Sequence, residues 1–171
     1  MGTRYMRLQA FPPAAPQGYV RRVPVDVTTA IDIARPPDEV AAYAADPDHV
    51  TAWYANISRV QWLTPPPVAV GSRLAFVARF LGRELSYTYE VVALEPGRRL
   101  VMRTDQGPFP METTYEWAPT GTGGTRMTLR NRGAPTGWSS VAAPVMAAAV
   151  RRANAKDLAR LRSLLEGRPE T

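Results

Sequence analysis

Tyrosine side chains recur on alternate residues of segments whose pattern predicts β-strands. Tyr87 and Tyr89 lie two residues apart, and Tyr115 belongs to a later alternating segment. Alternation places such rings on one face of a sheet. Tyrosine hydroxyls can orient a flexible substrate and move protons at enolisable carbons. Because a buried hydroxyl needs a hydrogen-bond partner, the pattern favours an amphipathic pocket. The alternative is that these rings simply fill a core.

Other candidates for catalysis are few. The chain has one histidine, His49, and no cysteine. His49 lies in a predicted short helix, which we expect at the mouth of the cavity. It could serve there as a proton-transfer group or a gate; the alternative is a solvated helix residue. Thiolate nucleophiles are excluded, and we predict no metal site and no cofactor. The glycine-rich segment 120–124 lies between two strands, so we interpret it as a hairpin turn. Alternation also places no carboxylate on the inner strand faces, so no catalytic acid–base pair is expected there.

Length and composition predict one soluble domain. The chain has 171 residues, of which 45% are apolar and 21% charged, as in ordinary globular proteins. The longest apolar run, residues 141–150, is too short for a membrane span, which needs roughly 20 residues. The net charge of +6 comes mostly from scattered arginines, so no nucleic-acid partner is expected. Without cysteine or a secretory signal, a cytoplasmic protein of bacterial type is predicted.

The chain divides into an extension over 1–23, one domain over 24–167 and a tail over 168–171. Alternation predicts a strand over 25–33, and Pro37 and Asp46 mark the starts of two short helices. Further strands are expected over 57–63, 73–80, 85–94, 98–104, 111–117 and 125–132. A helix over 144–166 follows, with an apolar stripe made of Val141, Val145, Ala148, Leu158, Leu161 and Leu165.

Short turns between the last six strands predict an antiparallel meander with one apolar and one charged face. A single helix cannot fill the concave face of a strongly curved seven-stranded sheet. The space between helix and sheet must therefore hold bulky side chains or a cavity, and the polar-tipped rings favour a cavity. We expect Trp53 and Tyr54 at its mouth, as a lid or as anchors of the short helices, and Trp138 on the opposite rim.

Several short sequence segments lie at the junctions and turns between the predicted elements. They are Ile31–Val40 at a strand-to-helix junction, Ala45-Asp46-Pro47 followed by Trp53, Val70–Arg73 opening a strand, and Tyr89–Leu100 around a turn. In order and spacing they resemble the helix-grip superfamily of START domains and birch-pollen-allergen-like proteins, and most closely its polyketide cyclase/dehydrase and lipid-transport family. The resemblance covers about residues 25–166. It implies an α+β helix-grip fold, in which a curved seven-stranded antiparallel sheet wraps around a long C-terminal helix, with two short helices after the first strand.

The resemblance implies carriage of hydrophobic ligands or aromatase/cyclase chemistry. It supplies no catalytic motif that could be assigned to residues of this sequence. We predict a protein that binds a hydrophobic or aromatic small molecule between the sheet and the C-terminal helix. The alternatives are an aromatase/cyclase acting on a polyketide-like substrate and a basic surface-interaction module; catalytic residues are not assigned. The candidate ligand-binding residues are Trp53, Tyr54, Trp62, Phe76, Tyr87, Tyr89, Met102, Tyr115, Trp138 and Val145.

Overall fold

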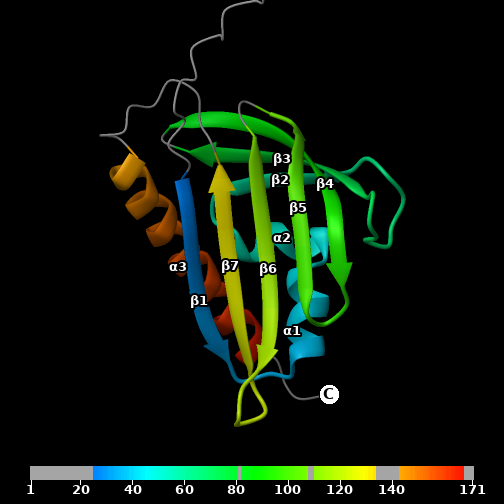
Figure 1. Cartoon of the computed structure of the whole chain (residues 1–171), viewed down its shortest axis with the longest axis vertical. Coiled ribbons are helices and arrows are strands. Elements are labelled where there is room, and N and C mark those ends of the chain that lie inside the picture. The colour runs from blue at the N-terminus through cyan, green and yellow to red at the C-terminus, as the bar shows by residue number, and fades with distance from the viewer. Residues whose placement is uncertain (1–24, 81, 108–109, 134–142, 168–171) are drawn as a thin grey trace, which may run out of the picture.

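The computed structural model describes residues 25–80, 82–107, 110–133 and 143–167 (Figure 1). The predicted extension 1–23, the tail 168–171 and Trp138 lie outside these residues. The strands are β1 (Val25–Ile33), β2 (Ile57–Trp62), β3 (Arg73–Phe80), β4 (Arg83–Glu95), β5 (Arg99–Gln106), β6 (Met111–Pro119) and β7 (Thr125–Gly133). The helices are α1 (Pro37–Ala44), the 3-10 turn η1 (Pro47–His49), α2 (Val50–Trp53) and α3 (Ala143–Glu166).

The seven strands form one antiparallel sheet in the order β1-β7-β6-β5-β4-β3-β2. Strands β2 to β7 are the predicted meander, and β1 closes the sheet by pairing with β7. The sheet curves, and α3 runs behind it alongside β1. Helices α1 and α2 also lie behind the sheet, toward the right of the view (Figure 1). The predicted helix-grip α+β fold is confirmed.

The short helices start where the sequence predicts. Pro37 occupies the first turn of α1, where its missing N–H costs nothing, and Asp38 and Glu39 complement the helix dipole. Asp46 then caps η1, because its side chain accepts a hydrogen bond of 2.9 Å from the Asp48 N–H. The inner side of α1, including Val40, is buried. These turns place α2, and hence Trp53 and Tyr54, beneath the sheet.

The C-terminal end of α3 is fastened to the end of β1. The Arg35 Nε donates a hydrogen bond of 3.1 Å to the Leu165 carbonyl oxygen. The Ala34 N–H donates one of 2.9 Å to the Glu166 Oε1. A cation near the last carbonyls of a helix interacts favourably with the helix dipole. Leu161 and Leu158 are fully buried one and two turns before Leu165, so this half of α3 is held firmly against the sheet.

The N-terminal half of α3 presents a different face from the predicted one. Val145 is 72% exposed, and Ala148 is also exposed, whereas Met146 is buried. Val145 precedes Leu161 by sixteen residues, which at the α-helical repeat turns the side chain about 160° away from it. The apolar stripe predicted through Val145 and Ala148 is therefore wrong. The inner face continues instead through Asn154 and Asp157, which are both buried.

In strand β4 a bulge exchanges which residues face the core. In β4 the register against β5 shifts between Val91 and Ala93. After the shift Leu94 is paired with Leu100 and packs against the core. Unbroken alternation from Tyr87 and Tyr89 predicts Ala93 on the inner face, and this prediction is wrong because a bulge inserts one unpaired residue and so exchanges the two faces. Before the bulge the alternation holds, and Tyr87 and Tyr89 both face the cavity.

Ion pairs cover the outer face of the sheet. Arg130 Nη2 lies 2.6 Å from Asp26 Oδ2 across the β1–β7 pair, and Arg103 Nε lies 2.7 Å from Glu112 Oε2 across the β5–β6 pair. Such exposed pairs contribute about 0.2–1 kcal/mol each. Much of the positive charge on this face is therefore matched by carboxylates. In the described part of the chain, no helix combines the length and apolarity needed to span a bilayer.

Candidate functional site

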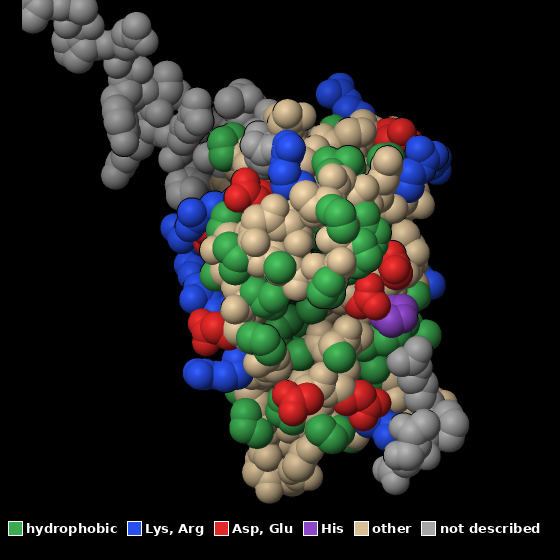
Figure 2. All heavy atoms as spheres, turned by 90° about the vertical axis from the view of Figure 1, so that its right-hand side faces the viewer, with side chains coloured by type: hydrophobic (Ala, Val, Ile, Leu, Met, Phe, Trp, Pro, Cys, Tyr) green, Lys and Arg blue, Asp and Glu red, His purple; other side chains and the backbone are tan. Residues whose placement is uncertain are grey.

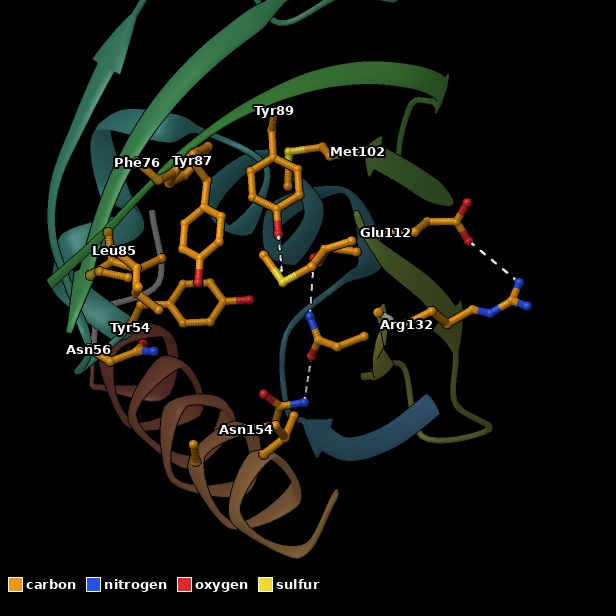
Figure 3. A pocket seen from close by; sticks show the side chains of 18 of the residues that line it. Tyr54, Asn56, Phe76, Leu85, Tyr87, Tyr89, Met102, Glu112, Arg132 and Asn154 are labelled. Carbon is orange, nitrogen blue, oxygen red and sulfur yellow. Dashed lines mark hydrogen bonds and ion pairs between the residues drawn. The ribbon is translucent and has the colours of Figure 1, made fainter. Parts of the chain in front are cut away.

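A cavity of about 600 Å³ lies between the concave face of the sheet and α3 (Figure 3). This volume falls within the range of about 300–1,000 Å³ typical of small-molecule sites. The apolar part of its wall consists of Val25, Ile57, Phe76, Ala78, Leu85, Met102, Met111, Met146, Val150 and Ala153. The polar part consists of Tyr54, Asn56, Arg83, Tyr87, Tyr89, Glu112, Thr113, Tyr115, Asn131, Arg132, Asn154 and Asp157, with Gly133 beside them.

The structure brings together most of the predicted ligand-binding residues. The cavity wall contains Tyr54, Phe76, Tyr87, Tyr89, Met102 and Tyr115. Their side chains come from α2's C-terminal cap and from β3, β4, β5 and β6, so alternation on neighbouring strands aims them at one space (Figure 3).

The other predicted site residues lie elsewhere. Trp53 is fully buried in the core, where its ring stacks on Tyr54 with a centroid distance of 4.0 Å. Trp62 is outside the cavity wall, and its Nε1 donates a hydrogen bond of 2.9 Å to Asp48 Oδ1. Val145 points away from the cavity, for the reason of helix phase given above. The bulky tryptophans therefore support the wall from behind and anchor the short helices.

A pair of tyrosine hydroxyls forms one polar point of the cavity. Tyr54 Oη and Tyr115 Oη lie 2.8 Å apart and share a hydrogen bond. Burial raises the pKa of both phenols well above the ordinary value, and the hydrogen bond adds to the rise for Tyr54 and opposes it for Tyr115. Both groups are therefore neutral at physiological pH and can donate hydrogen bonds.

A carboxyl group lies near this pair. Asp157, on α3, is 3% exposed and lines the cavity, and its Oδ1 accepts a hydrogen bond of 3.0 Å from the Ala55 N–H. Burial raises the pKa of this carboxyl, while the Ala55 N–H and the charges of Lys156 and Arg160 lower it. The sequence prediction considered carboxylates on the strand faces only and therefore missed Asp157 on the helix. Helical phase with Leu161, four residues later, is the signal that places Asp157 inward.

A second polar feature links α3 to the sheet. Asn154 Nδ2 donates a hydrogen bond of 2.7 Å to Asn131 Oδ1 on β7, and Asn131 Nδ2 donates one of 3.1 Å to Thr113 Oγ1 on β6 (Figure 3). The sequence predicts Asn131 and Thr113 on the inner face, and both line the cavity. Asn154 was missed, because only apolar residues were used to trace the inner stripe of the helix.

Aromatic rings from adjacent strands line another side. The Phe76 and Tyr89 rings pack edge to face, with centroids 5.5 Å apart, and those of Tyr87 and Tyr89 are 6.3 Å apart. Burial raises the pKa of Tyr89 to about 12, while hydrogen bonding to Thr113 opposes the rise. Edge-to-face pairs contribute about 0.5–1.5 kcal/mol beyond the area they bury. They hold the rings in place, so this wall is pre-formed.

Charged side chains line one end of the cavity, where β1 begins and β7 ends. Arg132 Nη1 lies 3.8 Å from Glu112 Oε1, and both side chains are partly exposed. Arg83, at the start of β4, also lines the cavity and is exposed. This end is therefore polar and solvated, in contrast to the aromatic interior.

His49 lies away from the cavity. Its ring stacks on Tyr43 with a centroid distance of 4.1 Å, and its Nδ1 lies 3.4 Å from Asp46 Oδ2. The histidine, purple in Figure 2, is at the surface beside acidic side chains. The expectation that it stands at the cavity mouth is wrong. Among the residues that the structure describes, no three potential ligand side chains converge to hold a metal ion.

Comparison with solved structures shows the same fold. A protein from Thermus thermophilus has a TM-score of 0.71 and 18% identity, with 81% of this chain and 94% of that chain covered. The Zhui aromatase/cyclase from Streptomyces has a TM-score of 0.68 and 18% identity, with 84% and 94% covered. The di-domain StfQ aromatase/cyclase from the steffimycin pathway has a TM-score of 0.71 and 16% identity, with 86% and 52% covered.

No curated protein matches the chain in a sequence comparison. A family model does match, over residues 24–166, which includes every described strand and helix. Its description is polyketide cyclase/dehydrase and lipid transport. The predicted class of function, a helix-grip protein that binds hydrophobic ligands, is confirmed at the level of this family. The chain belongs to the polyketide cyclase/dehydrase and lipid transport family.

Proposed function

We propose that the protein binds a hydrophobic, ring-containing small molecule in the cavity between the sheet and α3. The observation that carries the proposal is the cavity of about 600 Å³, whose wall is mainly apolar and aromatic with a few fixed polar groups. That combination is typical of ligand sites, because apolar area supplies affinity and a few polar groups fix orientation. Each 100 Å² of ligand apolar surface removed from water contributes about 2.5 kcal/mol before the costs of binding.

The wall suits a range of ring systems. Met102, Met111 and Met146 line it together with the tyrosines. Methionine side chains are flexible and polarizable, adapt to irregular shapes and make favourable contacts with aromatic rings. The tyrosine rings, by contrast, are held by their neighbours. We therefore expect the protein to accept related ligands of similar size with affinities that differ modestly.

Two alanines on α3 provide a matched test. Ala153 lines the cavity, whereas Ala148 is exposed on the same helix. Ala153→Phe should fill part of the cavity and weaken binding of the neutral fluorescent dye N-phenyl-1-naphthylamine at least tenfold. Ala148→Phe should leave binding within twofold of the wild type. Equal binding by both variants, or no binding of this dye or of comparable apolar probes by the wild type, contradicts the proposal.

The second candidate function is an aromatase/cyclase activity. Its specific support is the buried Asp157 carboxyl with its raised pKa close to the Tyr54–Tyr115 pair. A carboxyl group and neutral phenols can serve as proton acceptor and donors at enolisable carbons. The test is conversion of a carrier-bound poly-keto chain, and Asp157→Asn should abolish it while dye binding persists. The same product distribution with and without protein removes this candidate.

We also propose a cytoplasmic location and no nucleic-acid partner. The absence of cysteine supports a reducing compartment, and hence the cytoplasm. The pairing of Arg126 with Asp32 and of Arg130 with Asp26 argues against a nucleic-acid surface on that face of the sheet. Salt-sensitive binding to heparin near physiological ionic strength would favour a basic interaction module instead.

A further inference from the structure

The Tyr89 hydroxyl has an unusually weak hydrogen-bond acceptor. This side chain comes from β4 and lines the cavity, and its hydroxyl donates to Met111 Sδ at 4.0 Å (Figure 3). A thioether sulfur is a weak acceptor compared with oxygen. A buried hydroxyl that lacks a good acceptor is less favourable than a well-paired one. The Tyr89 proton is therefore available to any better acceptor that enters the cavity.

The polar side chains beside Tyr89 are hydrogen-bonded to one another. Asn154 donates to Asn131, and Asn131 in turn donates to the Thr113 hydroxyl oxygen. Burial raises the pKa of Tyr89 while hydrogen bonding to Thr113 lowers it, so the Thr113 hydroxyl lies near that of Tyr89. The Asn131 amide already donates to the Thr113 oxygen, and Met111 Sδ is the acceptor that the structure gives to the Tyr89 hydroxyl.

The members of this hydrogen-bond series and the neighbouring Tyr89 come from four different elements. Asn154 is on α3, Asn131 on β7, Thr113 on β6 and Tyr89 on β4. Asn154 and Thr113 are 6% and 5% exposed, so the series is shielded from bulk water by the protein around it. The Tyr89 ring is itself held by the Phe76 and Tyr87 rings, so its hydroxyl has a fixed place beside this series, which is what a specific recognition group requires.

We propose that the Tyr89 hydroxyl is a specificity-determining donor that exchanges Met111 Sδ for an acceptor oxygen of the ligand. The inference rests on the proposed binding function and narrows it. The preferred ligand has an apolar, ring-containing body and a carbonyl oxygen that reaches the Tyr89–Met111 contact. A hydrocarbon of the same shape binds less tightly, because it leaves the hydroxyl with the sulfur alone.

The test combines two isosteric probes with two variants. The probes are 2-acetylnaphthalene, which carries a carbonyl oxygen, and 2-isopropenylnaphthalene, which carries a methylene group in its place. Tyr89→Phe removes the donor, and Met111→Leu removes the competing sulfur with little change of volume. Dissociation constants for each probe and protein are measured by fluorescence titration, and the fold of each variant is checked by circular dichroism.

The two variants should act in opposite directions on the ketone. Tyr89→Phe should weaken ketone binding about fivefold, and Met111→Leu should strengthen it severalfold, because the hydroxyl then lacks any acceptor in the empty protein. The readout for each variant is the ratio of the ketone and hydrocarbon dissociation constants, in which a change in the shape of the wall that affects both probes cancels. Equal effects on both probes, or a Met111→Leu variant that binds the ketone no better than the wild type, overturn the inference and leave the proposed function standing. If the wild type binds neither probe nor N-phenyl-1-naphthylamine, the proposed function itself fails.

Discussion

Tyr54 Oη and Tyr115 Oη lie 2.8 Å apart although they are 61 residues apart in the sequence. Their contact joins the C-terminal cap of α2 to the middle of β6, so it ties the short helices to the sheet at the cavity wall. Trp53 packs behind both rings, with its ring centroid 6.1 Å from that of Tyr115. The pair therefore belongs to the structure of the wall as well as to its chemistry.

Removing either hydroxyl should destabilise the protein through the one that is left behind. We expect Tyr54→Phe and Tyr115→Phe each to lower the free energy of unfolding by about 1–2 kcal/mol, because a buried hydroxyl loses its partner. The double variant should cost less than the sum of the two, by about 1 kcal/mol. Urea denaturation of the four proteins measures this coupling. Additive effects would show that the two hydroxyls do not interact in solution.

Asp157 should make stability depend on pH in an unusual direction. Its folded-state pKa lies above the ordinary value of 3.8, so the fold favours the protonated carboxyl. The resulting stabilisation is complete below that ordinary value and is lost as the pH rises through the raised pKa. Asp157→Asn keeps an acceptor for the Ala55 N–H and removes the charge. Its free energy of unfolding should therefore rise relative to the wild type between about pH 4 and pH 7.

Asp26 provides the control of opposite sign. The hydrogen bond from Arg130 lowers the pKa of Asp26, with the Arg130 and Arg132 charges adding to the effect. Its stabilisation is present above the ordinary pKa and is lost as the pH falls through the lowered one. Asp26→Asn should thus be less stable than the wild type at pH 7 and approach it in acid. Denaturation curves of both variants at several pH values would contradict this account if the two differences changed in the same direction.

Gly107 should control the position of the Tyr87 ring. A Cβ atom at Gly107 would lie 3.0 Å from Tyr87 Cδ1, so Gly107→Ala must move that ring by a few tenths of an ångström. Because Tyr87 lines the cavity, we expect a change of at least threefold in the dissociation constant of N-phenyl-1-naphthylamine. At Gly121 a Cβ atom would meet nothing within 4 Å, so Gly121→Ala should bind the dye as the wild type does. Identical titration curves for all three proteins would show that the position of the Tyr87 ring does not affect dye binding.

The phase of α3 can be tested with two adjacent residues. Val145→Ser should change the free energy of unfolding by no more than about 0.5 kcal/mol, because Val145 is exposed. Met146→Ser should cost about 2 kcal/mol or more, because Met146 is buried against the cavity. Thermal denaturation distinguishes them. If Val145→Ser destabilised the protein more than Met146→Ser, the inner face of α3 would be the apolar stripe predicted from the sequence.

The sheet and the short helices could be predicted because local signals dominate there. Alternation in segments such as 111–117 marks the inner face directly, and Pro37 and Asp46 each favour a helix start for a stereochemical reason. The aromatic cavity residues follow from the same alternation. No local signal distinguishes Trp53 from Tyr54, however, since both end a short helix and only packing decides that one ring enters the core.

The polar residues of α3 could not be found by the same reasoning. An amphipathic stripe is traced through apolar residues, and a helix that borders a cavity can place polar residues on its inner face. The Asn154 amide donates a hydrogen bond to Asn131, and one Asp157 carboxylate oxygen accepts a hydrogen bond from the Ala55 N–H. Both side chains therefore tolerate burial. The bulge in β4 has no sequence signature either, and it exchanges Ala93 for Leu94 on the inner face.

The methionine methyl groups offer the most direct test of a ligand in this cavity. Met102, Met111 and Met146 line it, whereas Met127 is fully buried in the core and is not part of its wall. In protein labelled with ¹³C at the methionine methyls, titration with 2-acetylnaphthalene should shift the first three resonances by ring currents and leave that of Met127 in place. Saturable binding that leaves all three cavity methyls unmoved would contradict the account.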